Sequence, residues 1–330
     1  MDRRVAGIAK DLPDISDVFA AHSLLHGVIR TTPVFFWAEH NVYLKVESLQ
    51  KTGSFKLRGA FTLLKDPAFQ KGVVTASSGN HGSALAYAAS CLGISACVVM
   101  PEDAPAVKVS TCRRYGARVV LWGTTSPQRQ EKAQALAGEW GWAYAESYDH
   151  PRIIAGQGTV GLELLQQLRG LKQVVCPIGG GGLISGVAVA CKSLAPHVKI
   201  VGVEPAGAAR MTRSLATGHR EVVPKVRTIA DGLRVSQPGT LTFPLIQKGV
   251  DQIVTVSDGD IRQAMGALFY EQKLVVEPSG AATVAALLAG HLELCDKTAL
   301  VLSGGNIDAS LLAELVENNW QEGMNATREE

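Results

Sequence analysis

The sequence has few of the features that mark membrane proteins or nucleic-acid-binding proteins. Basic and acidic residues nearly balance, so the formal net charge of the 330-residue chain is only +2. A charge this small gives no reason to expect binding to nucleic acid or to an acidic membrane. The sequence also has no apolar run long enough to span a bilayer. We therefore expect neither a nucleic-acid partner nor a membrane partner.

Cysteine is scarce, and no two cysteines form a C-x-x-C pair. This spacing gives no metal-binding or redox motif, and a chain of this length does not need a disulfide framework. We expect reduced thiols, mostly in apolar surroundings, and a cytoplasmic protein. The six cysteines are Cys91, Cys97, Cys112, Cys176, Cys191 and Cys295.

Two common nucleotide-binding fingerprints are also missing. Four consecutive glycines follow the apolar run at 173–178, but they match neither G-x-G-x-x-G nor the P-loop pattern. Four glycines lose much conformational entropy on folding. Their placement between a strand and a helix makes sense if backbone N–H groups wrap a phosphate; the alternative is a tight structural turn. These residues are Gly179, Gly180, Gly181 and Gly182.

Short runs rich in Val and Ile alternate with helical patterns along the whole chain, which predicts an α/β fold with mostly parallel sheets flanked by helices. We expect strands at 41–47, 72–77, 96–101, 118–123, 173–179, 199–205, 252–257 and 298–305. We expect helices at 81–93, 126–140, 158–170 and 183–195. In such sheets, ligands bind where strands end and helices begin.

Two further small-residue turns follow predicted strands. The turn SSGNHG, at 77–82, offers hydroxyl and amide groups together with the free N–H groups of a helix start. Its alternative is an N-capping loop without a ligand, and its histidine alone favours a capping or packing role. The turn SGGN, at 303–306, places Ser303 at a strand end, where its hydroxyl could bond a heterocycle nitrogen.

Lys56 lies in the segment LQKTGSFKLRGA, at 49–60, between small residues. Taken alone it could be an ordinary surface cation. Together, a phosphate cradle, a partner for a heterocycle and this lysine indicate a phosphorylated aldehyde cofactor, because lysine forms Schiff bases with carbonyls. Pyridoxal 5'-phosphate (PLP) is the cofactor of this kind.

At this point the chain resembles the fold-type II PLP-dependent serine/threonine dehydratase and serine racemase family. The resemblance runs over roughly residues 15–315, in the family's order, through GSFKLRGA, SSGNHG, IAGQGT, GGGGLISG, VGVEP, TIADGL, EPSGAA and LSGGN. It implies a two-domain fold like that of the tryptophan synthase β chain. The large PLP-binding domain would comprise 1–64 and 146–330, and the small mobile domain 65–145. It also implies a homodimer or homotetramer and a small amino-acid substrate.

The resemblance also implies roles for single residues. Lys56 would hold PLP and move the α-proton, Phe55 would pack against the cofactor ring, and Ser303 would face the pyridine nitrogen. The four glycines would hold the phosphate, and Asn80 would bond the ring hydroxyl. The residues implied in substrate binding are Ser77, Ser78, Gly79, Asn80, His81 and Tyr148.

The implied reaction is β-elimination of a β-hydroxy amino acid, in which L-threonine or L-serine gives a 2-oxo acid and ammonia. A hydroxyl at Ser78, opposite Lys56, could return a proton to Cα and invert it. Serine racemase therefore stays open, as does a dehydratase of another hydroxy amino acid such as 3-hydroxyaspartate.

The family's racemase-like members hold a divalent cation, and this sequence matches that site only in part. Glu204 and Ala208 match two ligand positions, but Arg210 stands where an acidic residue is expected. A guanidinium makes a poor neighbour for a cation. We expect Arg210 to neutralise Glu204 and the dependence on a divalent metal to be lost.

Overall fold

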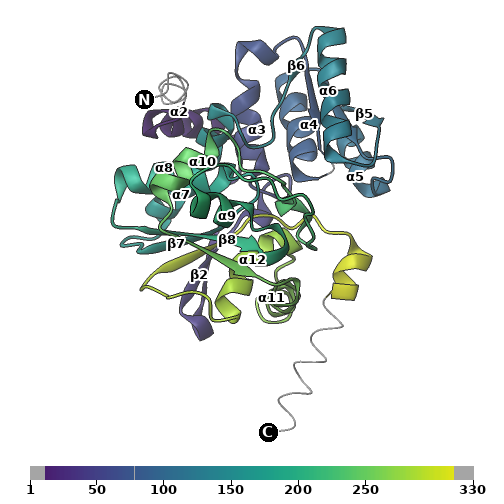
Figure 1. The fold of residues 1–330 in the computed structure, drawn as a ribbon. Coiled ribbons are helices and arrows are strands. Elements are labelled where there is room, and N and C mark those ends of the chain that lie inside the picture. The colour runs from purple at the N-terminus through teal and green to yellow at the C-terminus, as the bar shows by residue number, and fades with distance from the viewer. Residues whose placement is uncertain (1–11, 78, 316–330) are drawn as a thin grey trace.

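The computed structural model describes residues 12–77 and 79–315, which form two β-sheets with helices around both (Figure 1). The six-stranded sheet has the order β1-β2-β10-β7-β8-β9, and only its β1–β2 pair is antiparallel. The four-stranded sheet has the order β5-β4-β3-β6 and is parallel throughout. This is the mixed α/β architecture with mostly parallel sheets that the sequence predicts.

The strands are β1 (Val34–Trp37), β2 (Val42–Val46), β3 (Val73–Ala76), β4 (Ala96–Met100), β5 (Arg118–Leu121), β6 (Ala143–Tyr144), β7 (Gln173–Pro177), β8 (Lys199–Pro205), β9 (Gln252–Val256) and β10 (Thr298–Leu302). The α-helices are α2 (Ile15–Leu25), α3 (Lys56–Leu64), α4 (Asn80–Leu92), α5 (Ala106–Arg114), α6 (Ser126–Trp140), α7 (Pro151–Gln167), α8 (Gly182–Leu194), α9 (Arg210–Thr217), α10 (Thr242–Gly249), α11 (Asp258–Tyr270) and α12 (Pro278–Leu288). Short 3-10 helices include η1 (Ala38–His40), η2 (Glu47–Leu49), η3 (Pro67–Phe69), η4 (Ala206–Ala208) and η5 (Asp231–Leu233).

All eight predicted strands and all four predicted helices are present, and α7 differs most from its predicted range. It begins at Pro151 rather than at 158. Proline is well suited to the first turn of a helix, and the His150 ring accepts a hydrogen bond from the Arg152 N–H at 3.2 Å. The short strands β1 and β6 were not expected.

Both faces of each sheet are covered by helices, as buried parallel strands require. Side chains of α11 and α12 pack on one face of the six-stranded sheet, and those of α7, α8 and α10 pack on the other. The four-stranded sheet lies between α4 and α5 on one face and α6 on the other. It is formed by residues 73–144 and lies at the upper right of Figure 1. The domain boundaries at 64 and 145, and the mobility of the smaller domain, stay predictions.

All six cysteines lie in the described ranges and are free, although Cys91 is exposed. Within the same ranges, no helix combines the length and apolar character needed to cross a bilayer.

A buried ionic network joins β2, α3 and α7, and its central residue, Arg58, lies two residues after Lys56 in α3. Arg58 donates to both oxygens of Glu47, at 2.8 and 2.9 Å, and to Glu163 at 2.7 and 2.9 Å. Lys45 reaches Glu163 at 2.6 Å. All four side chains are at most 3% exposed. Two cations and two anions share one dry volume, so each charge has a partner.

The pKa values of the network reflect this pairing. Burial alone would raise the pKa of Glu47, but the Arg58 guanidinium lowers it below its usual value. Burial alone would lower the pKa of Arg58, and the two carboxylates raise it instead. Burial lowers the pKa of Lys45 despite its acidic neighbours. The first turn of α3, which begins at Lys56, is therefore tied to the large sheet through Arg58 and its two carboxylate partners.

Replacing Glu163 by Gln tests this network. The change leaves Arg58 and Lys45 to share one carboxylate, and unbalancing a buried ion pair costs about 3 kcal/mol or more. We expect the free energy of unfolding, measured in urea, to fall by that amount. The control is Glu39→Gln, at an exposed glutamate of η1, for which we expect a change within about 0.5 kcal/mol. Equal losses in the two variants would contradict the network's role.

Candidate active site

Lys56 is the first residue of α3, and its side chain points toward the chain around Tyr148. Its Nζ donates to the Ser147 carbonyl oxygen at 2.9 Å and lies 5.3 Å from the centre of the Phe55 ring. Burial lowers the pKa of Lys56 to about 8, an effect that the Glu277 carboxylate opposes. A lysine with this pKa holds a useful fraction of neutral amine near pH 7.

The glycine run forms the turn between β7 and α8, and Tyr148 packs against it. A Cβ added at Gly180 would lie 2.2 Å from the Tyr148 ring, and one at Gly182 would lie 2.9 Å from the Tyr148 carbonyl oxygen. Gly181 has φ +98°, in the region that favours glycine. The first N–H groups of α8 have no acceptor within the helix. Only glycines allow this close approach, and the turn suits a phosphate.

The carbonyl groups of the same turn are held from its other side. Thr242 donates from Oγ1 to the Gly180 oxygen at 2.7 Å. Arg210 donates to the Ile178 oxygen at 2.6 Å and also to the Gly179 oxygen. These hydrogen bonds tie the carbonyl groups at this turn to Thr242 and Arg210.

The partly matched cation site is filled by a side chain of the protein. Arg210 Nη1 lies 3.1 Å from Glu204 Oε1 and also donates to the Ala208 carbonyl. The second Glu204 oxygen accepts from the N–H and the hydroxyl of Thr212, at 2.9 and 2.8 Å. Glu204 and Arg210 are fully buried. The guanidinium therefore lies among the carboxylate and carbonyl oxygens that could otherwise face a cation.

Asn80 begins α4 and is bonded through both ends of its amide. Its Nδ2 donates to Glu277 Oε1 at 2.6 Å, and its Oδ1 accepts from Asn306 Nδ2 at 2.7 Å. In the same turn, Ser77 Oγ accepts from the N–H groups of Gly79 and Gly82, at 3.3 and 3.0 Å. These contacts bring the 77–82 turn against the 303–306 turn.

Ser78 lies outside the described residues, so its predicted second acid/base role stays a prediction.

His81 is 3% exposed, and within the described ranges neither ring nitrogen has a hydrogen-bond partner. Burial lowers its pKa to about 3, and the charge of Lys56 acts in the same direction. The ring is therefore neutral, and it cannot offer a positive charge to a substrate carboxylate.

Ser303 directly follows β10, is 3% exposed, and has neighbours that connect it to both Lys56 and the glycine run. Its carbonyl accepts from the Phe55 N–H at 3.1 Å, and its hydroxyl donates to the Ser279 carbonyl at 3.5 Å. The Ser279 hydroxyl accepts from the Gly232 N–H at 2.8 Å. The Gly232 oxygen in turn lies 3.0 Å from where a Cβ on Gly179 would stand. A chain of contacts thus links Phe55, Ser303 and Gly179.

Glu277 belongs to this site, and sequence reasoning gave it no role. It directly precedes Pro278, and the sequence therefore indicates only that Glu277 stands before the start of a helix. Burial raises its pKa to about 7, although the hydrogen bond from Asn80 opposes the shift. A carboxylate with a raised pKa beside a lysine with a lowered one is typical of a functional site. The contact with Asn80 reveals its place in the site, and the sequence does not show that contact because the two residues lie 197 positions apart.

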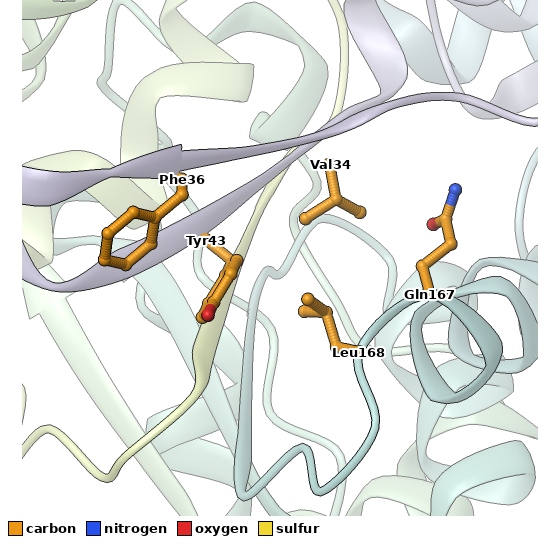
Figure 2. A pocket seen from close by; sticks show the side chains of 5 residues that line it. All are labelled: Val34, Phe36, Tyr43, Gln167 and Leu168. Carbon is orange, nitrogen blue, oxygen red and sulfur yellow. The ribbon is translucent and has the colours of Figure 1, made fainter.

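Another hollow on the surface contains none of these residues. It lies between β1, β2 and the end of α7, and is lined by Val34, Phe36, Tyr43, Gln167 and Leu168 (Figure 2). It offers aromatic and aliphatic side chains with one amide, and no lysine or glycine turn. Its lining therefore differs from the groups that gather near Lys56.

The family model described as pyridoxal-phosphate dependent enzyme matches residues 26–304, and the chain belongs to this family. The turn of glycines, the lysine with a lowered pKa and the buried serine fit that cofactor, which is PLP.

Curated relatives carry more particular names. The L-threonine ammonia-lyase of Geobacter sulfurreducens is 44% identical over 84% of this chain and 70% of its own. The catabolic L-threonine dehydratase of Escherichia coli K12 is 40% identical over 93% of this chain and 98% of its own. The L-threo-3-hydroxyaspartate ammonia-lyase of Saccharomyces cerevisiae is 39% identical over 92% of this chain and 97% of its own.

Solved structures agree with this fold. The threonine deaminase of T.th. has a TM-score of 0.85 at 44% identity, over 90% of this chain and 99% of its own. Maize serine racemase has a TM-score of 0.86 at 36% identity, over 94% and 99%. The chain is therefore similar over most of its length to a deaminase and to a racemase.

Gly180→Ala should weaken PLP binding, because the new methyl group would displace the Tyr148 ring from the turn. We expect the dissociation constant, measured by absorbance on the cofactor-free protein, to rise more than about tenfold, or 1.4 kcal/mol. Gly138→Ala is the matched control, since no atom lies within 4 Å of its added methyl. It should bind PLP normally and gain up to about 1 kcal/mol in stability within α6. Unchanged binding in Gly180→Ala would contradict the cradle.

Proposed function

We propose that the protein catalyses dehydration and deamination of L-threonine and L-serine, giving a 2-oxo acid and ammonia. The observation that carries this proposal is the placement of Lys56, with its lowered pKa, beside the glycine turn and Ser303. The names of the relatives support the choice of substrate, because two independent bacterial relatives at 40% identity or more are named for L-threonine.

When bound, PLP supplies an aldehyde carbon that links to an amino group and a ring that withdraws electrons from Cα. Lys56 supplies the amine that holds the cofactor and, once released, the base that takes the α-proton. A lysine amine serves these roles best when its pKa lies near the working pH. The bond from Lys56 to the Ser147 carbonyl keeps the amine directed toward the Tyr148 side of the site.

Other residues of the chain bind and orient. The N–H groups of the glycine turn and the start of α8 would hold the phosphate, and Phe55 would pack against the ring. Asn80 would donate to the ring oxygen. Ser303 would face the ring nitrogen, and a hydroxyl there, unlike a carboxylate, would not force that nitrogen to be protonated. A hydroxyl at this place would thereby suit loss of the β-hydroxyl of the substrate. The substrate is held by Ser77, Ser78, Gly79, Asn80, His81 and Tyr148.

Racemisation of serine is the second candidate, and lyase activity on 3-hydroxyaspartate the third. The likeness to maize serine racemase and to the yeast hydroxyaspartate lyase supports keeping both. A proton returned to the opposite face of Cα by Ser78 would invert the substrate instead of releasing ammonia.

Product analysis on L-threonine and L-serine separates these reactions. We expect the PLP-loaded protein to release 2-oxobutanoate from threonine and pyruvate from serine, with ammonia. Lys56→Ala is the control and should abolish both, since it removes the amine and the base. D-serine with little pyruvate would favour the racemase instead. No product from either amino acid would contradict the proposed substrates, and L-threo-3-hydroxyaspartate would be tried next.

Divalent metal should be dispensable, because the Arg210 guanidinium already balances Glu204. We expect the rate of 2-oxo acid release to be unchanged after treatment with EDTA. Adding back Mg²⁺ or Ca²⁺ should then have no effect. Loss of activity in EDTA that either ion restores would overturn this expectation.

We also propose that the chain works as a homodimer or homotetramer in the cytoplasm. Phe35 and Phe36 are 40% and 52% exposed on the edge strand β1, and Phe36 lines the hollow of Figure 2. Exposed aromatic groups on a sheet edge favour association with another chain. Light scattering should give about two or four times the 34.9 kDa of one chain. A mass of one chain at micromolar concentration would contradict assembly.

The free cysteines support the proposed cytoplasmic compartment, because disulfide bonds are rare there.

A further inference from the structure

The side-chain amide of Asn80 is held by hydrogen bonds at both ends, more than a single contact with a cofactor requires. Its Nδ2 donates to Glu277 and its Oδ1 accepts from Asn306, at 2.6 and 2.7 Å. An asparagine amide has two N–H donors on one atom and an acceptor on the other. With the acceptor end occupied and one donor used, one N–H remains. The orientation of the amide is therefore decided by two neighbours, and the group left without a partner among the described residues is a donor.

Both neighbours are themselves fixed. Asn306 Nδ2 also donates to the Thr52 carbonyl at 2.8 Å. Asn306 Oδ1 would lie 2.2 Å from a Cβ on Gly53, whose φ is +73°. The Glu277 N–H donates to the Gly304 carbonyl at 3.1 Å. Glu277 Oε1 would likewise lie 2.2 Å from a Cβ on Gly304. Because Gly53 and Gly304 have no side chain, there is space beside them for the side chains of Asn306 and Glu277 to reach Asn80.

The elements involved come from both sheets. Asn80 begins α4, which packs on the four-stranded sheet, whereas Glu277 and Asn306 adjoin α12 and β10 at the six-stranded sheet. The hydrogen bond to Glu277 is short, at 2.6 Å, and joins an amide donor to a carboxyl oxygen. Above its pKa of about 7 the Glu277 carboxyl group is ionised, and hydrogen bonds to ionised acceptors are stronger than those to neutral ones. Of the two contacts, the one to Glu277 gives Asn80 its stronger hold.

We propose that Glu277 is a positioning residue that, together with Asn306, fixes the Asn80 amide with its remaining N–H toward the ring oxygen of bound PLP. The inference rests on the proposed cofactor-binding role of Asn80. Without Glu277, the amide loses its main acceptor and can turn its own oxygen toward the ring oxygen. Two acceptors would then face each other, and PLP binding would weaken.

The test is a double-mutant cycle on PLP affinity, measured by absorbance with cofactor-free protein. Glu277→Ala should raise the dissociation constant about tenfold, as expected for one hydrogen bond to a charged group. Asn80→Ala should raise it by a similar or larger factor. If Glu277 acts through Asn80, the double variant should bind no more weakly than Asn80→Ala alone. Losses that multiply in the double variant would overturn the proposal, as would normal binding by Glu277→Ala.

Two further variants separate positioning from a general loss of structure. Glu277→Gln keeps a carbonyl acceptor for Asn80 and should recover about fivefold of the affinity that Glu277→Ala loses. Asn306→Ala changes an exposed side chain and should weaken binding by about threefold. Glu271→Ala, at an exposed carboxylate six residues earlier, is the matched control and should bind normally. If Glu277→Ala does not fold, lack of any effect in both Glu277→Gln and Asn306→Ala would overturn the proposal.

Failure of this inference is distinct from failure of the proposed function. Product release from L-threonine is measured on the same preparations. Wild-type protein that binds PLP and obeys the cycle, yet releases no 2-oxo acid, would overturn the substrate and leave the role of Glu277 intact. Normal product release with multiplying losses would overturn the role of Glu277 alone. Wild-type protein that does not bind PLP would overturn both.

Discussion

The ionic network around Arg58 is the constraint on which the position of Lys56 depends. Arg58 lies two residues after Lys56 in the first turn of α3, and its guanidinium is bonded to Glu47 after β2 and to Glu163 in α7. Removing four charges from water is costly, and pairing them only recovers that cost when the geometry is right. The network is therefore better understood as a device for orientation than as a source of stability. Rotating α3 would break several charged hydrogen bonds together, so the network opposes movement of Lys56 away from the Ser147 carbonyl.

Those turns share an origin in the topology of the sheets. β3, β7 and β10 are parallel strands, and each ends in a short segment of small residues: 77–82, 179–182 and 303–306. Parallel strands present their carboxyl ends at one edge of a sheet, which is where α/β proteins bind ligands. Here two sheets contribute to one site. The contacts of Asn80 with Glu277 and Asn306 join their edges, so cofactor binding and the relation between the sheets are expected to depend on each other.

The sequence predicted what repeats locally and missed what is brought together only by folding. Val-rich runs and glycine turns mark eight strands because burial on both faces leaves a continuous apolar pattern. β6, with two residues, is too short to leave one, and Phe35 and Phe36 of β1 are exposed. Lys56 could be singled out because small residues lie close to it on both sides, at 52–54 and 59–60. Glu277, Glu163 and Arg58 could not, since their partners lie 11 to 197 residues away and charged residues usually read as surface.

Burial acts on every titratable group around Lys56 in the direction that removes charge. It lowers the pKa of Lys56 to about 8 and that of His81 to about 3, and it raises the pKa of Glu277 to about 7. A pKa near 8 instead of 10.5 raises the fraction of neutral lysine at pH 7 by about two orders of magnitude. Only the neutral amine can attack an aldehyde or accept a proton. The burial that leaves the His81 ring without hydrogen-bond partners among the described residues also lowers the pKa of Lys56. A substitution that admitted water beside His81 would raise the pKa of Lys56 toward its ordinary value. The amine would then be protonated at pH 7, like that of a lysine on the surface.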